Sequence, residues 1–234
     1  MENVSKPMYR YWEITKSTAR YILAHTFVKR WRSNYIKHPG TSHAIYINPS
    51  ENRGRVLLMM NGITQPRLDN LWKIAVSTYK PTLVIDVGVN YGECLFSVSY
   101  PENCHVIGIE ANLHLKKYIE RTRKNHPDRA RMRMIYAIAS NEIKQNQHFY
   151  VDKWWSGLSS AVPKHLSNRK RFEKHEVKSV TIDSILQGQP LAQQKVLFKI
   201  DVEGNEQQVM EGMVESIERC EHMLGSLNSI ANIC

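Results

Sequence analysis

The segment from residue 83 to residue 92 constrains the fold more than any other part of the chain. It reads Leu-Val-Ile-Asp-Val-Gly-Val-Asn-Tyr-Gly, an apolar run that leads into a turn with two glycines. Open α/β sheets bind ligands beyond the carboxyl ends of their strands, and glycine lets the backbone approach a ligand closely there. The segment therefore predicts a buried strand over Leu83–Asp86 that ends at a ligand site.

A second apolar run supports this interpretation. Residues 105–110 read His-Val-Ile-Gly-Ile-Glu and place Glu110 a little more than about 20 residues beyond the first turn. A carboxylate at this distance can accept both hydroxyl groups of a ribose. We therefore predict that Glu110 binds the ribose of a nucleoside cofactor.

The turn itself favours an adenosyl cofactor over a dinucleotide. The dinucleotide fingerprint is G-x-G-x-x-G, whereas this turn carries Gly88, Asn90 and Gly92 at alternate positions. The charge of Asp86 would repel a pyrophosphate but would attract the ammonium of an amino-acid group. S-adenosylmethionine has no phosphate and carries both an ammonium and a sulfonium. The charges therefore predict S-adenosylmethionine as the cofactor.

Strands and helices are predicted to alternate along the rest of the chain, which is the pattern of a parallel sheet flanked by helices. After the first strand we expect a helix over 94–99, a strand over 106–110 and a helix over 114–125. Further strands are predicted over 132–139, 148–151, 177–180, 196–200 and 223–227, with a helix over 206–217.

The N-terminal part is predicted to form an extension, residues 1–43, ahead of a main domain over 44–234. Tyr9–Trp31 has the pattern of a basic amphipathic helix, which either contacts a membrane surface or phosphorylated partner or packs as a lid on the sheet. Two short strands, Ala44–Ile47 and Val56–Met60, are predicted to form a hairpin, and a helix is predicted over Arg67–Tyr79.

Composition excludes several classes of protein. With 42% hydrophobic and 23% charged residues among 234, the chain suits one globular domain, and no apolar run approaches the roughly 20 residues of a membrane span. The four cysteines form no C-x-x-C pair, so we expect reduced thiols and a cytoplasmic location. The net charge of +10 permits a nucleic-acid partner, but the basic residues are spread along the chain, so such a partner is not favoured.

Four motifs together resemble those of the FkbM-type methyltransferases in order and spacing. They are the segments 86–92 (DVGVNYG), 109–112 (IEAN), 180–183 (VTID) and 199–206 (KIDVEGNE). The resemblance covers residues 44–227. It implies the Rossmann-like α/β fold of class I methyltransferases, S-adenosylmethionine as cofactor, and methylation of a hydroxyl on a carbohydrate or other small natural product.

The resemblance also assigns roles to single residues. It implies that the methionine end of the cofactor is held by Asp86, Gly88, Asn90 and Gly92, the ribose by Glu110, and the adenine by the segment from Ala137 to Ser140. The sequence stops soon after Leu227, where the family continues through a helix and an antiparallel strand pair, and Asn228 and Ser229 stand in place of an acid. We therefore expect a mostly parallel central sheet that lacks this last strand pair.

Two carboxylates are the candidate catalytic residues. Methyl transfer to an oxygen requires an acceptor in line with the methyl group and benefits from removal of the hydroxyl proton. Asp201 and Glu203 follow an apolar strand, which places them at the ligand-binding edge, whereas Glu206 is expected to stabilise a helix N-terminus. A magnesium ion on the two carboxylates would lack a third ligand, so no metal site is predicted. His175 is retained as a possible base.

The loop over 152–160 contains Trp154 and Trp155 and is unusually aromatic. It is either a hinged flap that stacks on an acceptor or an anchored surface loop. Three functions remain open at this point. The first is methylation of a small hydroxylated acceptor, such as a carbohydrate. The second is methylation of an RNA or cap ribose, and the third is non-catalytic cofactor binding.

Overall fold

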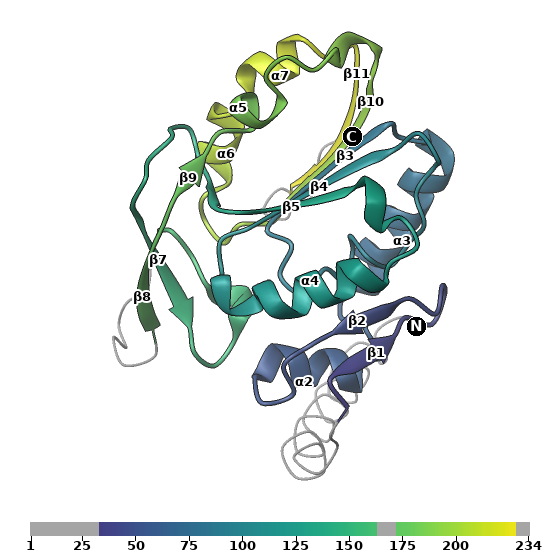
Figure 1. Cartoon of the computed structure of the whole chain (residues 1–234), viewed down its shortest axis with the longest axis vertical. Coiled ribbons are helices and arrows are strands. Elements are labelled where there is room, and N and C mark those ends of the chain that lie inside the picture. The colour runs from purple at the N-terminus through teal and green to yellow at the C-terminus, as the bar shows by residue number, and fades with distance from the viewer. Residues whose placement is uncertain (1–32, 163–171, 228–234) are drawn as a thin grey trace, which may run out of the picture.

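A five-stranded parallel sheet forms the centre of the computed structural model, which describes residues 33–162 and 172–227 (Figure 1). In spatial order the strands are β11 (His222–Leu227), β10 (Lys195–Ile200), β3 (Leu83–Val87), β4 (His105–Glu110) and β5 (Met132–Tyr136). All neighbouring strands in this sheet run parallel. The predicted α/β architecture is confirmed, and β11 is the last strand of the described residues.

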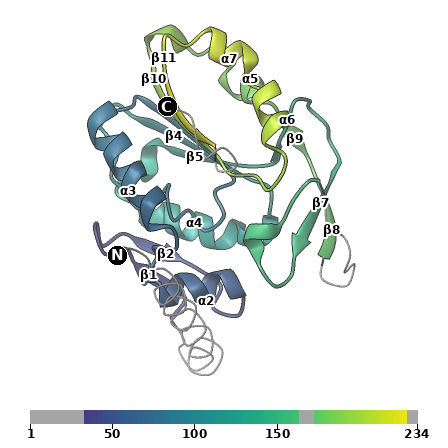
Figure 2. The same ribbon diagram turned by 180° about the vertical axis from the view of Figure 1, so that it is seen from behind.

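Helices cover both faces of the sheet, as Figures 1 and 2 show from opposite sides. One face carries α3 (Pro66–Ile74) and α4 (Lys116–Asn125). The other carries α5 (Ile182–Leu186), α6 (Glu206–Glu211) and α7 (Val214–Glu218). A sheet buried on both faces requires strands without polar alternation, and every residue of β3 is buried.

The core divides into two layers because successive side chains of a strand project to opposite faces. Val84 of β3 belongs to the layer that contains Trp72 of α3 and Ile119 of α4. Its neighbours in the strand, Leu83 and Ile85, belong to the layer on the α5–α7 side. The central strand therefore anchors both layers.

The direction of strand addition reverses at β3. The chain passes from β3 to β4 and β5 on one side, then returns to place β10 and β11 on the other side of β3. The crossover from β5 to β10 contains β6 (Ile138–Ala139), β7 (Gln147–Asp152), β8 (Phe172–Val177) and β9 (Ser179–Val180). There β6 pairs with β9, and β7 forms an antiparallel pair with β8. Open α/β sheets bind ligands at such a reversal.

The N-terminal hairpin differs from the prediction. β2 (Ala44–Tyr46) pairs with β1 (Tyr35–Lys37), which lies before residue 44, and the predicted strand over Val56–Met60 is wrong. Those residues lie in and at the end of α2 (Asn52–Met59), because the Glu51 carboxylate accepts the first free N–H groups of the helix at 2.9 and 3.0 Å. The division at residue 43 stays a prediction, and the predicted helix over 9–31 lies outside the described residues.

The helix predicted over 94–99 is also wrong, because this segment forms successive turns. Side chains make hydrogen bonds to backbone carbonyl oxygens that would accept backbone N–H groups in a helix. The hydroxyl of Tyr100 donates to the Leu95 carbonyl at 2.9 Å, and Nε2 of His126 lies 3.0 Å from the Val98 carbonyl oxygen. Local side-chain hydrogen bonds of this kind compete with helix formation.

The remaining predicted helices are present with modified ends. The helix over 67–79 consists of α3 and a π turn (Ala75–Tyr79), and that over 114–125 is a 3-10 turn followed by α4. The helix over 206–217 is divided into α6 and α7 at Gly212, where a Cβ would lie 2.0 Å from the Ser140 carbonyl oxygen. Among the described helices, none has the length and apolar character needed to cross a lipid bilayer.

Gly88→Ala should destabilise the fold strongly. Gly88 has φ of +83°, and a Cβ there would lie 1.9 Å from the Asp201 carbonyl oxygen. We expect the free energy of unfolding, measured by urea denaturation, to fall by more than about 3 kcal/mol. Gly188→Ala is the matched control, since Gly188 has φ of +77° but nothing within 4 Å, and should cost only about 1 to 2 kcal/mol. Equal losses would contradict the close approach of β3 and β10.

His126 should make stability depend on pH. Its buried ring contacts the Val98 carbonyl oxygen through Nε2, while Nδ1 accepts the backbone N–H of Asp128 at 3.1 Å. These two bonds use the neutral ring, and burial lowers the pKa of His126 to about 4. Because the folded pKa lies below the unfolded value of about 6.5, the folded state binds fewer protons between these values. The stabilisation is complete above about pH 6.5 and is lost as the pH falls towards 4.

The corresponding measurement is the free energy of unfolding from pH 7 to pH 4. His126→Gln should reduce its slope by up to about 1.4 kcal/mol per pH unit, the value for one proton. His148→Gln, which changes an exposed histidine of β7, should leave the slope unchanged. A slope that His126→Gln does not alter would show that this ring does not couple folding to protonation.

Candidate functional site

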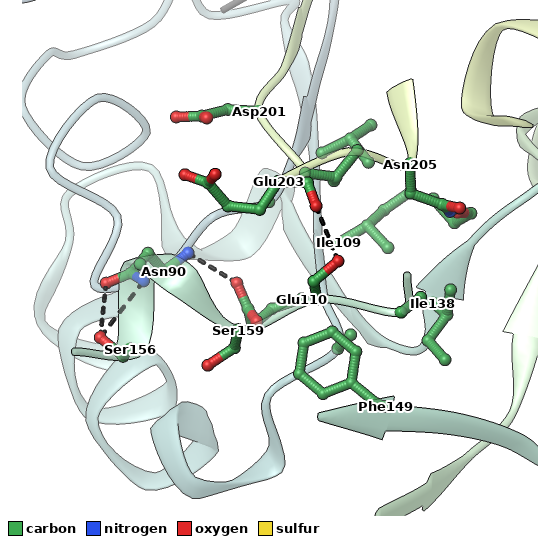
Figure 3. A pocket seen from close by; sticks show the side chains of 18 of the residues that line it. Asn90, Ile109, Glu110, Ile138, Phe149, Ser156, Ser159, Asp201, Glu203 and Asn205 are labelled. Atoms are coloured by element: carbon green, nitrogen blue, oxygen red, sulfur yellow. Dashed lines mark hydrogen bonds between the residues drawn. The ribbon is translucent and has the colours of Figure 1, made fainter. Parts of the chain in front are cut away.

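A cavity of about 210 Å³ lies at the carboxyl ends of the parallel strands, where the strand order reverses (Figure 3). Its walls come from the segments that follow β3, β4, β5 and β10, together with parts of the β5–β10 crossover. The lining residues that the sequence had indicated are Gly88, Asn90, Glu110, Ala137, Asp201 and Glu203. The structure therefore brings together side chains separated by more than a hundred residues in the sequence.

The turn after β3 has a backbone that favours glycine and asparagine. Asn90 has φ of +52°, a conformation in which asparagine is over-represented because its short side chain bonds to the local backbone. Here its Oδ1 accepts the N–H of Tyr91 at 3.0 Å. Its own N–H donates to Oε2 of Glu110 at 2.7 Å, as the dashed line in Figure 3 shows. The turn is thus fastened to the end of β4.

Glu110 is held by two backbone N–H groups. Asn90 donates to one carboxylate oxygen and Asn112 to the other, each at 2.7 Å. Burial raises the pKa of Glu110, and these two hydrogen bonds oppose the rise. Each oxygen of a carboxylate can accept a further hydrogen bond. Glu110 therefore offers a fixed pair of acceptors at the wall of the cavity.

Asp86 forms a buried ion pair with Lys199. The two residues are 1% and 5% exposed and occupy directly opposite positions on β3 and β10, with Oδ1 and Nζ 3.1 Å apart. Burial raises the pKa of Asp86, and the ammonium of Lys199 counteracts part of that rise. Burial lowers the pKa of Lys199, but the charges of Asp86 and Asp201 outweigh it, so its pKa is raised overall.

The ion pair alters the position expected for Asp86. Asp86 does not line the main cavity but borders a narrower adjoining one together with Lys199, Asp201 and Gly88. The ammonium that it contacts in the structure belongs to Lys199. Its predicted role toward the cofactor stays a prediction.

The sequence analysis missed Lys199 as a functional residue. A lysine inside the apolar run of β10 was the available signal, since a buried charge requires a partner. Asp86 is an acid inside the apolar run of β3. Two opposite charges, each inside an apolar strand, can satisfy each other only if the strands are neighbours. This pairing could have predicted the register of β3 against β10.

Asp201 and Glu203 project in the same direction from the segment that follows β10 (Figure 3). Asp201 Oδ2 lies 3.5 Å from Nζ of Lys199, which fixes its carboxylate near the ion pair. Glu203 is exposed at the edge of the cavity, and partial loss of hydration together with the charges of Asp201 and Glu206 raises its pKa. Such a group exchanges a proton more readily near neutral pH than an ordinary glutamate. Glu206 begins α6, as expected for a residue with a structural role.

Gly92, Ser140 and His175 are not among the residues that line the cavity. Gly92 has φ of +79°, and a Cβ there would lie 2.2 Å from the ring of Phe96, so its contact is with the core. Ser140 donates its N–H to the Val180 carbonyl, while Ala137–Ala139 reach the cavity.

The loop over 152–160, called the tryptophan loop below, lines one side of the cavity and is anchored by hydrogen bonds at two points. Trp155 and the serines that follow it line the cavity. The N–H of Ser156 donates to Glu51 at 2.9 Å, and the hydroxyl of Ser160 donates to the backbone carbonyl of Glu203 at 2.7 Å. These bonds attach the loop to α2 and to the segment after β10. The loop is therefore an anchored wall of the site.

Arg53 of α2 is a second lining residue that the sequence analysis missed. Its guanidinium bonds to Glu93 at 2.5 Å and to the hydroxyl of Thr64 at 2.9 Å, and it lies 5.7 Å from the ring centroid of Trp155. A guanidinium held in this way can bind a carboxylate. The prediction of a hairpin turn between Ala44–Ile47 and Val56–Met60, where the structure has the start of α2, concealed it.

Comparison with known proteins assigns the family. A family model described as the methyltransferase FkbM domain matches residues 86–224, which run from the end of β3 through β4, β5 and β10 into the first half of β11. No curated protein matches the chain. The match spans more than half of the sequence and includes most of the residues that line the cavity, but not Arg53.

Two solved structures are similar to this chain. The methyltransferase FkbM of Methylobacillus flagellatus KT is 16% identical, with a TM-score of 0.39, and the match covers 61% of this chain and 32% of that one. The O-methyltransferase TomG of Streptomyces achromogenes, involved in tomaymycin synthesis and solved in complex with SAM, is 8% identical, with a TM-score of 0.41 and coverage of 74% and 59%. The chain thus spans less than two thirds of the length of either.

Lys199→Met should destabilise the protein because it leaves the Asp86 carboxylate buried without its counter-charge. We expect the free energy of unfolding to fall by about 3 to 5 kcal/mol without any ligand. The double variant Lys199→Met with Asp86→Asn should lose less than the sum of the two single variants. Chemical denaturation of all four proteins measures this coupling. Additive losses would contradict an energetic link between the two residues.

Proposed function

The chain belongs to the FkbM methyltransferase domain family, which has the class I methyltransferase fold, and from this membership we propose that it is an S-adenosylmethionine-dependent O-methyltransferase. The observation that carries the proposal is the position of Glu110, whose carboxylate is fixed by two N–H groups at the wall of the cavity. The proposed acceptor is a hydroxyl of a small molecule such as a carbohydrate.

The residues of the cavity fit the three parts of this cofactor. Glu110 offers two acceptors to the ribose hydroxyls, and apolar side chains that include Ile109, Ile138 and Phe149 offer a surface for the adenine. The backbone of Gly88 and the guanidinium of Arg53 also line the cavity and suit the methionine carboxylate. The cavity therefore combines apolar and charged lining groups.

Glu203 is the proposed general base for the acceptor hydroxyl. The cofactor supplies a methyl group on a sulfonium, which needs an oxygen nucleophile in line with it. Glu203 lines the cavity, and its raised pKa suits it to accept the hydroxyl proton. Asp201, near Lys199, contributes a second negative charge beside the same cavity. These two residues were the catalytic candidates of the sequence analysis.

The wall formed by the tryptophan loop supports a sugar-like acceptor. An indole face can stack on the apolar face of a sugar ring. Trp155 lines the cavity together with Ser156 and Ser159. The hydroxyl groups of these serines can bond to acceptor hydroxyls. Because the loop is anchored to α2 and to the segment after β10, this surface is positioned before the acceptor arrives.

A ribose of RNA is the second candidate acceptor, and one observation favours it. Residues 116–133, which include α4, contain eight lysines and arginines but only two acids. Trp154 is 63% exposed and could stack on a base. A basic surface with an exposed aromatic ring suits a nucleic acid. Steep loss of binding with salt would support this candidate.

Calorimetric titration with S-adenosylmethionine tests the cofactor site. The wild-type chain should bind with a dissociation constant in the micromolar range, about −8 kcal/mol. Glu110→Ala should bind at least about tenfold more weakly, because both ribose acceptors are lost. Glu203→Gln should bind as the wild type does, since it is assigned to the acceptor. A folded wild type that does not bind would contradict the proposal.

Transfer of a radiolabelled methyl group distinguishes the acceptors. The wild type would be incubated with a panel of carbohydrates and hydroxylated natural products and, in parallel, with RNA. Label on a small acceptor that is lost in Glu203→Gln supports the proposed function, whereas label on RNA alone supports the second candidate. Cofactor binding without transfer to either class would identify a non-catalytic member of the family.

A further inference from the structure

Two histidines and a glutamate lie together outside the cavity. His114 belongs to the 3-10 turn after β4 (Leu113–Leu115), and Glu173 and His175 belong to β8. One ligand atom from each residue can be chosen such that all three lie within 4.8 Å of one another. The sequence analysis considered only Asp201 and Glu203 as metal ligands. It did not group His114 with the two β8 residues, which follow it by about sixty positions.

The strand geometry directs the two β8 side chains toward the turn after β4. Glu173 is opposite Val151 and His175 is opposite Phe149 in the β7–β8 pair, and directly opposite residues project from the same face. Val151 and Phe149 are buried in a cluster that includes Ala111. His114 follows Ala111 by three residues. The face of the hairpin that packs on this turn therefore carries both β8 ligands.

The contacts within the cluster leave ligand atoms that a metal ion could use. Nε2 of His175 is 3.1 Å from Oε1 of Glu173, but this buried nitrogen makes no hydrogen bond of good geometry within the described structure. The rings of His114 and His175 meet edge to face with centroids 4.9 Å apart. Imidazole nitrogens grouped in this way with a carboxylate oxygen can share a divalent cation.

We propose that His114, Glu173 and His175 form a zinc site that fastens the β7–β8 hairpin to the turn after β4. Two imidazole nitrogens and one carboxylate oxygen are a ligand set that zinc accepts, with water as the fourth ligand. Zinc sites join segments that are distant in sequence, which is the arrangement here. Small rotations of the two exposed side chains, His114 and Glu173, would bring the ligand atoms to bonding distance.

The position of the site gives it a consequence for the cavity. Phe149, opposite His175, and Ala111, three residues before His114, both line the cavity. A metal that fixes these two segments would hold one wall of the cavity in place. This role does not depend on which molecule the cavity binds, so the zinc proposal stands or fails independently of the proposed function.

Zinc titration of the untagged chain of 234 residues, after treatment with a chelator, tests the proposal. Calorimetry should find one zinc ion per chain with a dissociation constant of about 1 μM or lower, and zinc should raise the melting temperature by several degrees. His175→Ala and His114→Ala should each weaken binding at least about tenfold. His148→Ala is the matched control, because His148 is an exposed histidine of the same hairpin outside the cluster, and it should bind as the wild type does.

Two further measurements keep the test decisive. Circular dichroism establishes that each variant is folded, and Glu173→Gln, which keeps the side-chain size, should also weaken binding. Cobalt should replace zinc and give the visible absorption of a tetrahedral site in the wild type and in His148→Ala, but not in His175→Ala. The proposal is overturned if the wild type binds no zinc, or if the cluster variants bind zinc as tightly as the control.

Discussion

The buried pair of Asp86 and Lys199 is the interaction on which the rest of the structure depends. It joins the two strands between which the order of the sheet reverses, at positions directly opposite in register. A one-residue slip of β10 would leave both charges in the apolar core, so the pair favours one register strongly. In this register Gly88 packs closely against the backbone carbonyl of Asp201. The segments that follow β3 and β10 then border the cavity.

The same hydrogen bonds maintain the fold and prepare the site. The carboxylate of Glu110 accepts the N–H groups of Asn90, which has a left-handed backbone, and of Asn112. These two bonds fix the orientation of the carboxylate at the wall of the cavity. The backbone of the turn is therefore ordered before any ligand binds. Such preorganisation lowers the entropy cost of binding, because the donors are backbone groups that folding has already ordered.

The sequence predicted the parts of the fold that depend on local pattern. The apolar runs of β3, β4 and β10 and the glycine turn identified the parallel sheet and the ligand edge. The errors arose where distant side chains determine local structure. Residues 94–99 form turns because His126 and Tyr100 engage their carbonyls, and α2 begins where Glu51 caps it. Arg53 escaped notice with that helix, and Lys199 because its partner lies 113 residues away.

The lining residues of the cavity come from two kinds of segment, and only one kind is positioned by the sheet itself. The side that contains Gly88, Glu110 and Asp201 is made by strand ends, whose geometry follows from the sheet. The other side is made by Arg53 of α2 and by Trp155 of the β5–β10 crossover. The guanidinium of Arg53 is held by the carboxylate of Glu93, and the backbone next to Trp155 is held by the Ser156 N–H, which donates to the carboxylate of Glu51. Changes on this second side leave the sheet intact. Under the proposed function Arg53 serves the cofactor, so the loop that contains Trp155 is the part that can vary while the rest is retained, and acceptor choice is expected to reside in that loop.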